Sequence, residues 1–365
     1  MVRWQAHLWG ALLVCGAGVF ALQCSLEGLG DGVRPSSPEA GDGAASHAEA
    51  GPWPDRAIVA GLSAPDHVAV GPDFLYFTTA RAGGSVERCP IQGCAGEPEL
   101  IRPGQKDPRG LGVAQDGTIG WVNFAGGQVT LATRSPGASV WQFNQLAAGQ
   151  ESPAGMAILA KDDAIWSNFA AATGSPGVVR RTLGNSIVLS RKALEPGPIV
   201  LPRGTHDVVW GDSHGLSETT IEGDGSDGNA ACTFVTSEAG VQSLLYSITD
   251  PSQVYWSTFD GRLLAALRPP ASYALQHCNE GPSDIVTLVS VQGQIVSMAS
   301  SGSFIYFSAN ENGMGSLRVA TRSSGQIRVL LDGLDDPRGV AMDESYVYVA
   351  VRGDGTIRRV LRIDV

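Results

Sequence analysis

The chain has 365 residues, of which 43% are hydrophobic and 17% are charged, so it can bury a sizeable core in about one to three domains. Its 36 acidic residues outnumber its 25 lysines and arginines, and no basic stripe runs along the sequence, which excludes nucleic acid as an expected partner. The 47 glycines and 21 prolines are spread over the whole length, as expected for many short strands joined by turns.

The N-terminus has the layout of a secretory signal. Arg3 precedes an apolar run over residues 8–22, and polar residues follow it. This run of 15 residues is short for a transmembrane helix, which needs about 20. We therefore expect residues 1–23 to be a signal peptide and the mature protein to be exported, to a periplasmic or cell-surface location.

Cys24 directly follows this segment and resembles the lipid-modified cysteine of bacterial lipoproteins. Members of that family usually carry Leu three residues before the cysteine and Gly or Ala directly before it, whereas this chain has Ala21 and Gln23. The resemblance implies lipidation at Cys24 and a membrane contact made only through that anchor. Ordinary cleavage by a signal peptidase is the alternative.

Residues 24–55 are rich in Gly, Pro, Ala, Ser and acidic residues and contain almost nothing apolar to bury. This composition predicts a flexible acidic tether between the anchor and a folded domain at residues 56–365.

Seven short β-rich runs, each with a central aromatic residue, divide the folded domain. The aromatic residues are Tyr76, Trp121, Trp166, Trp210, Trp256, Tyr306 and Tyr348. Successive members are 45, 45, 44, 46, 50 and 42 residues apart. A period near 45 predicts an all-β fold, a seven-bladed β-propeller with four strands in each blade. A six-bladed ring is the alternative, and it leaves one aromatic run unassigned.

Each copy reads as four strands, which we order from the channel outward: a Pro-led strand, the aromatic strand, a Gly-led strand and an apolar strand. The last copy ends with its third strand at residues 356–363. Residues 56–62 align with the missing fourth strand, so we expect this N-terminal strand to complete the last blade in a velcro closure that hides the open edge.

This arrangement resembles the seven-bladed propellers of the NHL-repeat and streptogramin (virginiamycin B) lyase type. Through the stretch "RCPIQGC" it also resembles secreted, cysteine-bearing bacterial propeller lipoproteins. The resemblance covers residues 56–365 and implies the architecture far more firmly than an activity. Streptogramin lyases carry a Trp-Phe-Thr-Glu type sequence and use a His and Glu pair. The stretches "WVNF", "WSNF" and "WSTF" of this chain lack the Glu, which argues against lyase activity.

Four cysteines follow Cys24, an even number in a chain expected to be exported, so we predict disulfides. Cys89 and Cys94 flank a four-residue spacer with Pro90 and Gly93 that can bring the two sulfurs together. We also predict a bridge between Cys232 and Cys278 of neighbouring blades. A zinc site is the alternative, but only Cys278 has an adjacent histidine.

The connections from the outer strand to the next inner strand share one propeller face with the turns between the second and third strands. This face opens onto the channel and is the usual place for ligands. The sequence "DPRG" at residues 107–110 and again at 336–339 places Arg109 and Arg338 there, beside Asp66 and His67. Two arginines can hold a carboxylate or phosphate bidentately. The alternative is that they pair with channel acids and keep the strands in register.

A second candidate is a ring of short polar residues two positions after each aromatic residue: Thr78, Asn123, Asn168, Asp212, Thr258, Ser308 and Ala350. Asn123, Asn168 and Asp212 are similar to the oxygen ligands with which lactonase-type propellers hold calcium or zinc. The acidic partner that such a site requires is not evident, and small polar residues also make local hydrogen bonds. We therefore expect no cofactor, with calcium as the alternative.

These patterns predict a monomeric, non-catalytic scaffold that binds an envelope protein or a small molecule at the cell envelope. Its candidate ligand-binding residues are Asp66, His67, Arg109, Asn123, Asn168, Asp212, Thr258 and Arg338. The alternative is a lyase- or lactonase-like enzyme that uses the polar, metal-binding funnel.

Overall fold

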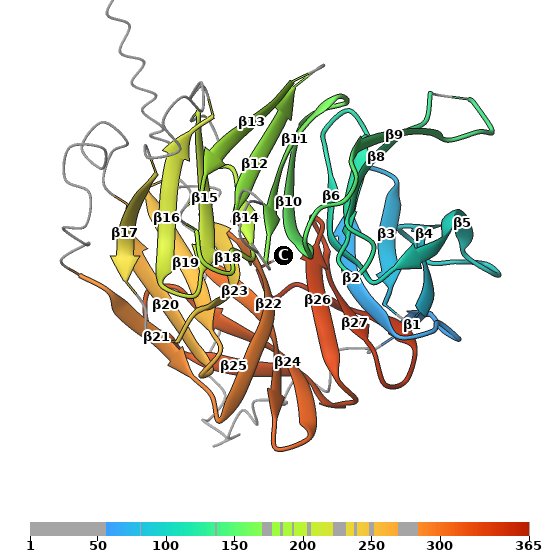
Figure 1. Cartoon of the computed structure of the whole chain (residues 1–365). Coiled ribbons are helices and arrows are strands. Elements are labelled where there is room, and N and C mark those ends of the chain that lie inside the picture. Colours follow the sequence, from blue (N-terminus) through green and yellow to red (C-terminus); the bar gives the residue numbers. More distant parts are fainter. Residues whose placement is uncertain are drawn as a thin grey trace, which may run out of the picture. The chain divides into compact units, whose positions relative to one another are not determined.

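Seven antiparallel, four-stranded sheets surround a common axis in the computed structural model (Figure 1). The structure describes residues 56–364 except 81, 136, 170–176, 183–184, 192, 203–205, 222–230, 237–238, 248–251 and 269–283. The predicted signal peptide, the lipidation site Cys24 and the tether lie outside the described residues. No helix among the described residues is long and apolar enough to cross a membrane.

Each sheet is one blade, and its strands follow the chain from the axis outward. Blade one consists of β2 (Pro65–Val70), β3 (Phe74–Thr79), β4 (Ala82–Pro90) and β5 (Glu99–Lys106). Blade two consists of β6 (Pro108–Val113), β7 (Ile119–Asn123), β8 (Gln128–Thr133) and β9 (Gln142–Ala147). Blade three consists of β10 (Pro153–Ala160), β11 (Asp163–Asn168), β12 (Val178–Thr182) and β13 (Asn185–Ser190).

The same order continues in the second half of the ring. Blade four consists of β14 (Ile199–Val200), β15 (Asp207–Asp212), β16 (Gly215–Thr220) and β17 (Cys232–Thr236). Blade five consists of β18 (Val241–Tyr246), β19 (Gln253–Thr258), β20 (Arg262–Leu267) and β21 (Val286–Ser290). Blade six consists of β22 (Gly293–Ser301), β23 (Phe304–Glu311), β24 (Met314–Thr321) and β25 (Ile327–Leu334).

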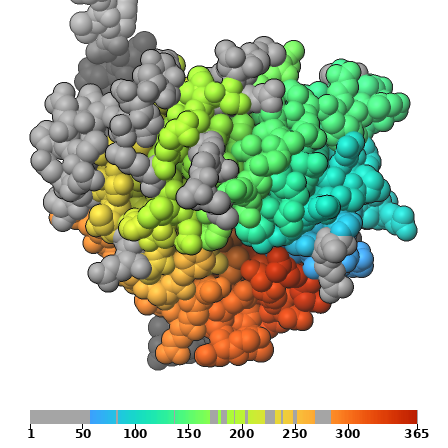
Figure 2. Space-filling model, in the orientation of Figure 1, coloured from blue at the N-terminus to red at the C-terminus, as the bar shows by residue number. Residues whose placement is uncertain are grey.

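Blade seven takes strands from both ends of the folded domain. It consists of β26 (Pro337–Met342), β27 (Tyr346–Val351), β28 (Thr356–Leu361) and β1 (Arg56–Val59). Strand β1 runs antiparallel to β28, with Arg56 opposite Arg359. The seven-bladed fold and its velcro closure are thus confirmed. In the space-filling view the blue N-terminal residues lie against the red C-terminal blade (Figure 2).

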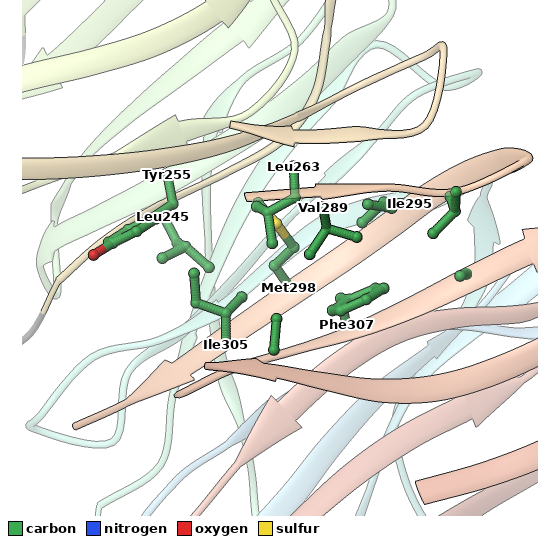
Figure 3. Packing of buried hydrophobic residues seen from close by; sticks show 11 residues of the cluster. Leu245, Tyr255, Leu263, Val289, Ile295, Met298, Ile305 and Phe307 are labelled. Atoms are coloured by element: carbon green, nitrogen blue, oxygen red, sulfur yellow. The ribbon is translucent and has the colours of Figure 1, made fainter. Parts of the chain in front are cut away.

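The core lies between the blades, because each sheet buries both of its faces against its neighbours. Trp121, Trp166, Trp210 and Trp256 of the second strands are at most 1% exposed. Between blades five and six, Leu263 and Val289 pack against Ile305 and Phe307 (Figure 3). Burying such side chains contributes about 1.5–3 kcal/mol each, which explains why the aromatic residue recurs in every repeat.

A buried charge cluster replaces apolar contacts at the seam between blades four and five. Arg268 Nη2 lies 2.5 Å from Asp207 Oδ2, and Arg268 Nε lies 2.5 Å from Glu218 Oε2. All three side chains are less than one tenth exposed. Because removing one partner would leave a buried charge uncompensated, this cluster fixes how the two blades meet.

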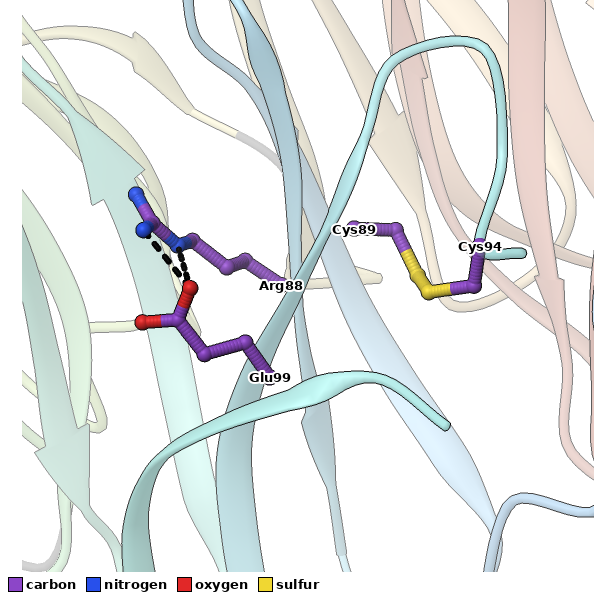
Figure 4. Close-up of a disulfide and its surroundings, with 4 residues drawn as sticks. All are labelled: Arg88, Cys89, Cys94 and Glu99. Atoms are coloured by element: carbon purple, nitrogen blue, oxygen red, sulfur yellow. Dashed lines mark hydrogen bonds and ion pairs between the residues drawn. A yellow bond between two sulfur atoms is a disulfide. The ribbon is translucent and has the colours of Figure 1, made fainter. Parts of the chain in front are cut away.

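The predicted disulfide between Cys89 and Cys94 is present, at the turn from β4 to β5 (Figure 4). Next to it, Arg88 donates two hydrogen bonds to Glu99 Oε2, at 3.0 and 2.7 Å. Cys232 is buried at the start of β17, and Cys278 lies outside the described residues. The bridge between Cys232 and Cys278 therefore stays a prediction.

The C-terminal residues fasten blade seven to blade six. Asp364 accepts hydrogen bonds from Arg362 Nη2 at 2.6 Å and from the Tyr306 hydroxyl at 2.8 Å, and Ser301 also donates to it. These partners, chiefly Arg362, hold the pKa of Asp364 far below its ordinary value of 3.8. The ionised carboxylate is therefore the stabilising form.

We predict that deleting residues 56–62 unfolds or aggregates the protein. The deletion removes β1 and exposes the edge of β28 as an unpaired template. Size-exclusion chromatography and thermal unfolding measure the effect. Deleting residues 25–52 is the control and should leave the propeller intact. A soluble, stable product of the first deletion would contradict the closure model.

We predict that Asp364→Asn lowers the free energy of unfolding at pH 7 by about 1–2 kcal/mol, the usual worth of a charge-assisted hydrogen bond. Because the folded pKa lies below the unfolded one, the stabilisation is complete above pH 3.8 and is lost as the pH falls further. Urea unfolding of both proteins at several pH values should show the two curves converging below about pH 4. A difference independent of pH would contradict an electrostatic latch.

Candidate functional site at the channel mouth

The two "DPRG" turns hold their arginines at the mouth of the channel. Asp107 and Asp336 adopt left-handed backbone conformations, with φ of 56° and 55°. Aspartate tolerates this region better than most residues. Each carboxylate pairs with the arginine two residues later in the chain. Arg109 Nη2 lies 2.7 Å from Asp107 Oδ2, and Arg338 Nη2 lies 2.9 Å from Asp336 Oδ2. The turn itself therefore orients each guanidinium.

Blade one differs from this pattern. Its inner strand begins Pro65-Asp66-His67, where blades two and seven have Pro-Arg-Gly. His67 Nε2 lies 3.3 Å from Asp66 Oδ2. Asp66 is buried, whereas the His67 side chain is 38% exposed. Blade one therefore presents an acid and a base at positions where its neighbours present a cation and a glycine.

Arg352 joins blade seven to blade one and was missed by the sequence analysis. Its guanidinium bonds to the Asp66 carboxylate, and its Nε lies 3.9 Å from Asp336 Oδ2. The backbone N–H of Arg352 donates to the backbone carbonyl of Asp336, just as that of Phe124 donates to the backbone carbonyl of Asp107, both at 3.0 Å. Arg352 thus replaces a repeat phenylalanine, and an alignment of this position would have revealed it.

These side chains form what we call the mouth cluster: Asp66, His67, Asp107, Arg109, Asp336, Arg338 and Arg352. The cluster comes from blades seven, one and two, and it brings the predicted Asp66, His67, Arg109 and Arg338 close together, whereas their role in ligand binding stays a prediction. Its three arginines and three aspartates balance when the histidine is neutral. The arginine side chains remain 28–39% exposed, although the Nε atom of each is buried, so a ligand can reach only the outer part of each side chain.

The charges and the burial of the mouth cluster shift the pKa values of His67 and Asp66. Burial, reinforced by Arg109 and Arg352 and opposed by Asp66, lowers the pKa of His67 below 6.5. His67 and the arginines together outweigh the burial of Asp66 and lower the pKa of its carboxyl below 3.8. At neutral pH the histidine is therefore neutral and the aspartate ionised.

The polar ring makes bonds between blades. Gln105 Oε1 at the end of blade one accepts hydrogen bonds from Trp121 Nε1 at 2.8 Å and from Asn123 Nδ2 at 2.9 Å. Gln150 Oε1 accepts equivalent bonds from Trp166 and Asn168, both at 3.0 Å. Each glutamine fastens its blade to the next one. The Asn side chains thus have a structural task that the sequence analysis did not foresee.

The ring members Asp212 and Thr258 serve their own strand ends. Asp212 Oδ1 accepts from the backbone N–H of His214 at 2.8 Å, and burial raises the pKa of Asp212. The Thr258 hydroxyl bonds to the neighbouring Asp260. In the described ranges no group of three or more His, Cys, Asp and Glu side chains is arranged to hold a metal ion.

The predicted equivalence of the ring positions was wrong in three blades. Pro108 lies opposite Asn123, but Pro65 lies opposite Thr79 and Pro337 opposite Val351, so Thr78 and Ala350 are one position out of register. Ser308 donates to a backbone carbonyl of the next blade at 2.6 Å, as Ser167 does at 2.7 Å. Ser308 is therefore equivalent to Ser167 and not to Asn168. Consecutive Tyr and Phe residues made the aromatic position ambiguous in blades one and six, whereas in blade seven the residue equivalent to Trp121 is Val349 and not Tyr348.

Comparisons with known proteins show the fold. No family model and no curated protein sequence matches the chain. A virginiamycin B lyase structure from Staphylococcus aureus matches with a TM-score of 0.63 and 13% identity, over 85% of this chain and 98% of that one. A streptogramin B lyase structure matches with a TM-score of 0.64 and 12% identity over the same shares. The computationally designed Ika8 protein matches with a TM-score of 0.54 and 15% identity, over 84% of this chain and 98% of that one. The resemblance to lyase-type propellers is confirmed at the level of architecture.

We predict that Gln105→Leu lowers the free energy of unfolding by about 1–3 kcal/mol, because the buried Trp121 Nε1 loses its acceptor. Urea denaturation measures the change. Gln128→Leu is the matched control: Gln128 also bonds to Asn123, at 3.1 Å, but is exposed, so its loss should change stability by less than about 0.5 kcal/mol. Equal effects would contradict the inter-blade role of Gln105.

Proposed function

We propose that the protein is an exported, lipid-anchored propeller that binds a ligand or partner through the mouth cluster without catalysing a reaction. The ligand carries an oxyanion, a carboxylate or sulfate-like group, which the outer N–H groups of Arg109, Arg338 and Arg352 recognise. The observation that supports the proposal is the meeting of these three partly exposed arginine side chains with His67 at one channel mouth.

An anionic ligand must compete with the aspartates of the chain for the three arginines. Each arginine already holds an aspartate of the chain, so at neutral pH an incoming anion meets a neutral cluster. Protonation of His67 leaves one net positive charge, which favours the anion. Binding therefore strengthens as the pH falls through the lowered pKa of His67.

Export is supported by the disulfide between Cys89 and Cys94, because disulfides persist in oxidising compartments. It is also supported by the apolar run at residues 8–22 and by Cys24 behind it. Anchoring through a lipid and a tether would leave the propeller free to meet an envelope protein or a small molecule as a monomer.

Sulfate is a suitable probe, because its charge does not change between pH 5 and 8. We predict that sulfate binds roughly tenfold more tightly at a pH low enough to protonate His67 than at pH 8, measured by isothermal titration calorimetry along the titration, since one added charge acts at short but partly screened range. His67→Gln should remove this pH dependence. Arg338→Met should weaken binding at both pH values.

Arg262→Met is the matched control. Arg262 pairs with Asp260 on the same face, in blade five, and is 38% exposed. An equal loss in this variant, or no saturable binding at the lower pH, would contradict the site. A stoichiometric divalent ion that disappears in both Asn168→Ala and Asp212→Ala would instead support the metal-dependent enzyme.

A further inference from the structure

A groove of about 710 Å³ opens on the propeller face opposite the mouth cluster, at the seam between blades seven and one. Its walls come from the turns that follow β2 and β26 and from the loop bridged by Cys89 and Cys94. The lining that matters is Ile91, Gln92, Met342, Tyr346 and Arg359. This volume lies within the usual range of small-molecule sites.

Arg359 supplies the groove with a cation that shares the lining with the acids Asp343 and Glu344. Its guanidinium carbon lies 4.5 Å from the centre of the Tyr346 ring, and Nη1 donates to the Ile91 carbonyl at 3.2 Å. In the part of the chain that the structure describes, no carboxylate forms an ion pair with Arg359. The neighbouring Arg362 differs, because Asp364 accepts two of its N–H groups at 2.9 and 2.6 Å.

The acid Asp343 of the lining is engaged by donors other than Arg359. Asp343 accepts hydrogen bonds from the backbone N–H groups of Ser345 and Tyr346, at 2.7 and 2.6 Å, and from the Tyr348 hydroxyl at 2.5 Å. Three donors thus hold its charge at the turn. Glu344, also in the lining, is exposed and well solvated.

The disulfide loop fixes the remaining wall. The Cys94 backbone N–H donates to the Ile58 carbonyl at 3.4 Å, and a Cβ on Gly93 would lie 3.3 Å from the same oxygen. The loop therefore packs directly on β1, and its Ile91 carbonyl also orients Arg359. The groove exists in this form only when the ring is closed and the loop is bridged.

We propose that this groove binds a small organic acid, with its carboxylate on Arg359 and its apolar body against Tyr346, Ile91 and Met342. A preoriented guanidinium makes charge-assisted hydrogen bonds to a carboxylate. The aromatic and aliphatic walls remove the apolar part of the ligand from water. Gln92 supplies a further polar group at the rim. This site is separate from the mouth cluster and does not depend on the function proposed for that cluster.

The test uses 3-phenylpropionate and its neutral amide as probes with the whole exported chain, by ligand-observed NMR and calorimetry at pH 7. We expect the acid to bind saturably and the amide at least tenfold more weakly. Arg359→Met, which keeps an unbranched stem over Tyr346, should weaken the acid at least tenfold and leave the amide unchanged. Thermal unfolding shows whether this variant is folded.

Two further variants test the walls and the charge. Glu344→Gln should strengthen binding of the acid, because it removes a repelling charge from the lip. Replacing both Cys89 and Cys94 by serine should weaken both probes. Arg109→Met at the opposite face should change neither. The proposal is overturned if acid and amide bind alike, or if folded Arg359→Met binds the acid as the unaltered protein does.

Discussion

The architecture depends on how closely the inner strands approach one another around the axis. A Cβ on Gly155 would lie 2.1 Å from the Gly197 carbonyl oxygen of the next blade. One on Gly339 would lie 2.8 Å from the Asp66 carbonyl, and one on Gly110 3.0 Å from the Ala154 carbonyl. No side chain fits at these points, which is why the third residue of the inner strand is glycine there. His67 holds that position in blade one, so the repeat relaxes its tightest constraint where it places an ionisable ring.

Closure of the ring gathers contacts that do not recur in the other repeats around blade seven. Strand β1 completes blade seven, Asp364 fastens that blade to blade six, and the bridged loop of blade one rests on β1. Other seams also carry inter-blade contacts, such as those of Gln105, Gln150 and Arg268, but only blade seven takes strands from both ends of the folded domain. The mouth cluster and the groove both use blades seven and one. The sector that holds the ring together is therefore also the sector whose side chains depart most from the repeat.

The sequence allowed the blade number, the strand order and the closure to be predicted because these features repeat. A repeat of about 45 residues and a last repeat with only three strands are compatible with few arrangements of strands and blades. The register of the aromatic strand was harder, because Tyr76-Phe77 and Tyr306-Phe307 offer two candidates for one buried position, and only strand pairing decides between them. Gln105 and Arg352 were missed for a related reason. Each acts on a neighbouring blade, and such contacts depend on the spacing of two sheets and not on the residues of one repeat.

The Arg109 and Arg338 pairings show why a correct placement does not settle a role. Both arginines lie at the mouth as expected, yet each is bound first by the aspartate of its own turn. The mouth cluster is therefore electrostatically satisfied by its own side chains, and any ligand must offer more than Asp107 and Asp336 already supply. Among the described residues, Arg359 on the opposite face contacts an aromatic ring, a backbone carbonyl and the Tyr348 hydroxyl, none of which carries a formal charge. The guanidinium groups of the two faces thus have different surroundings. The mouth cluster changes its charge by protonation of a neighbouring histidine, whereas the groove presents a guanidinium that is charged at every physiological pH.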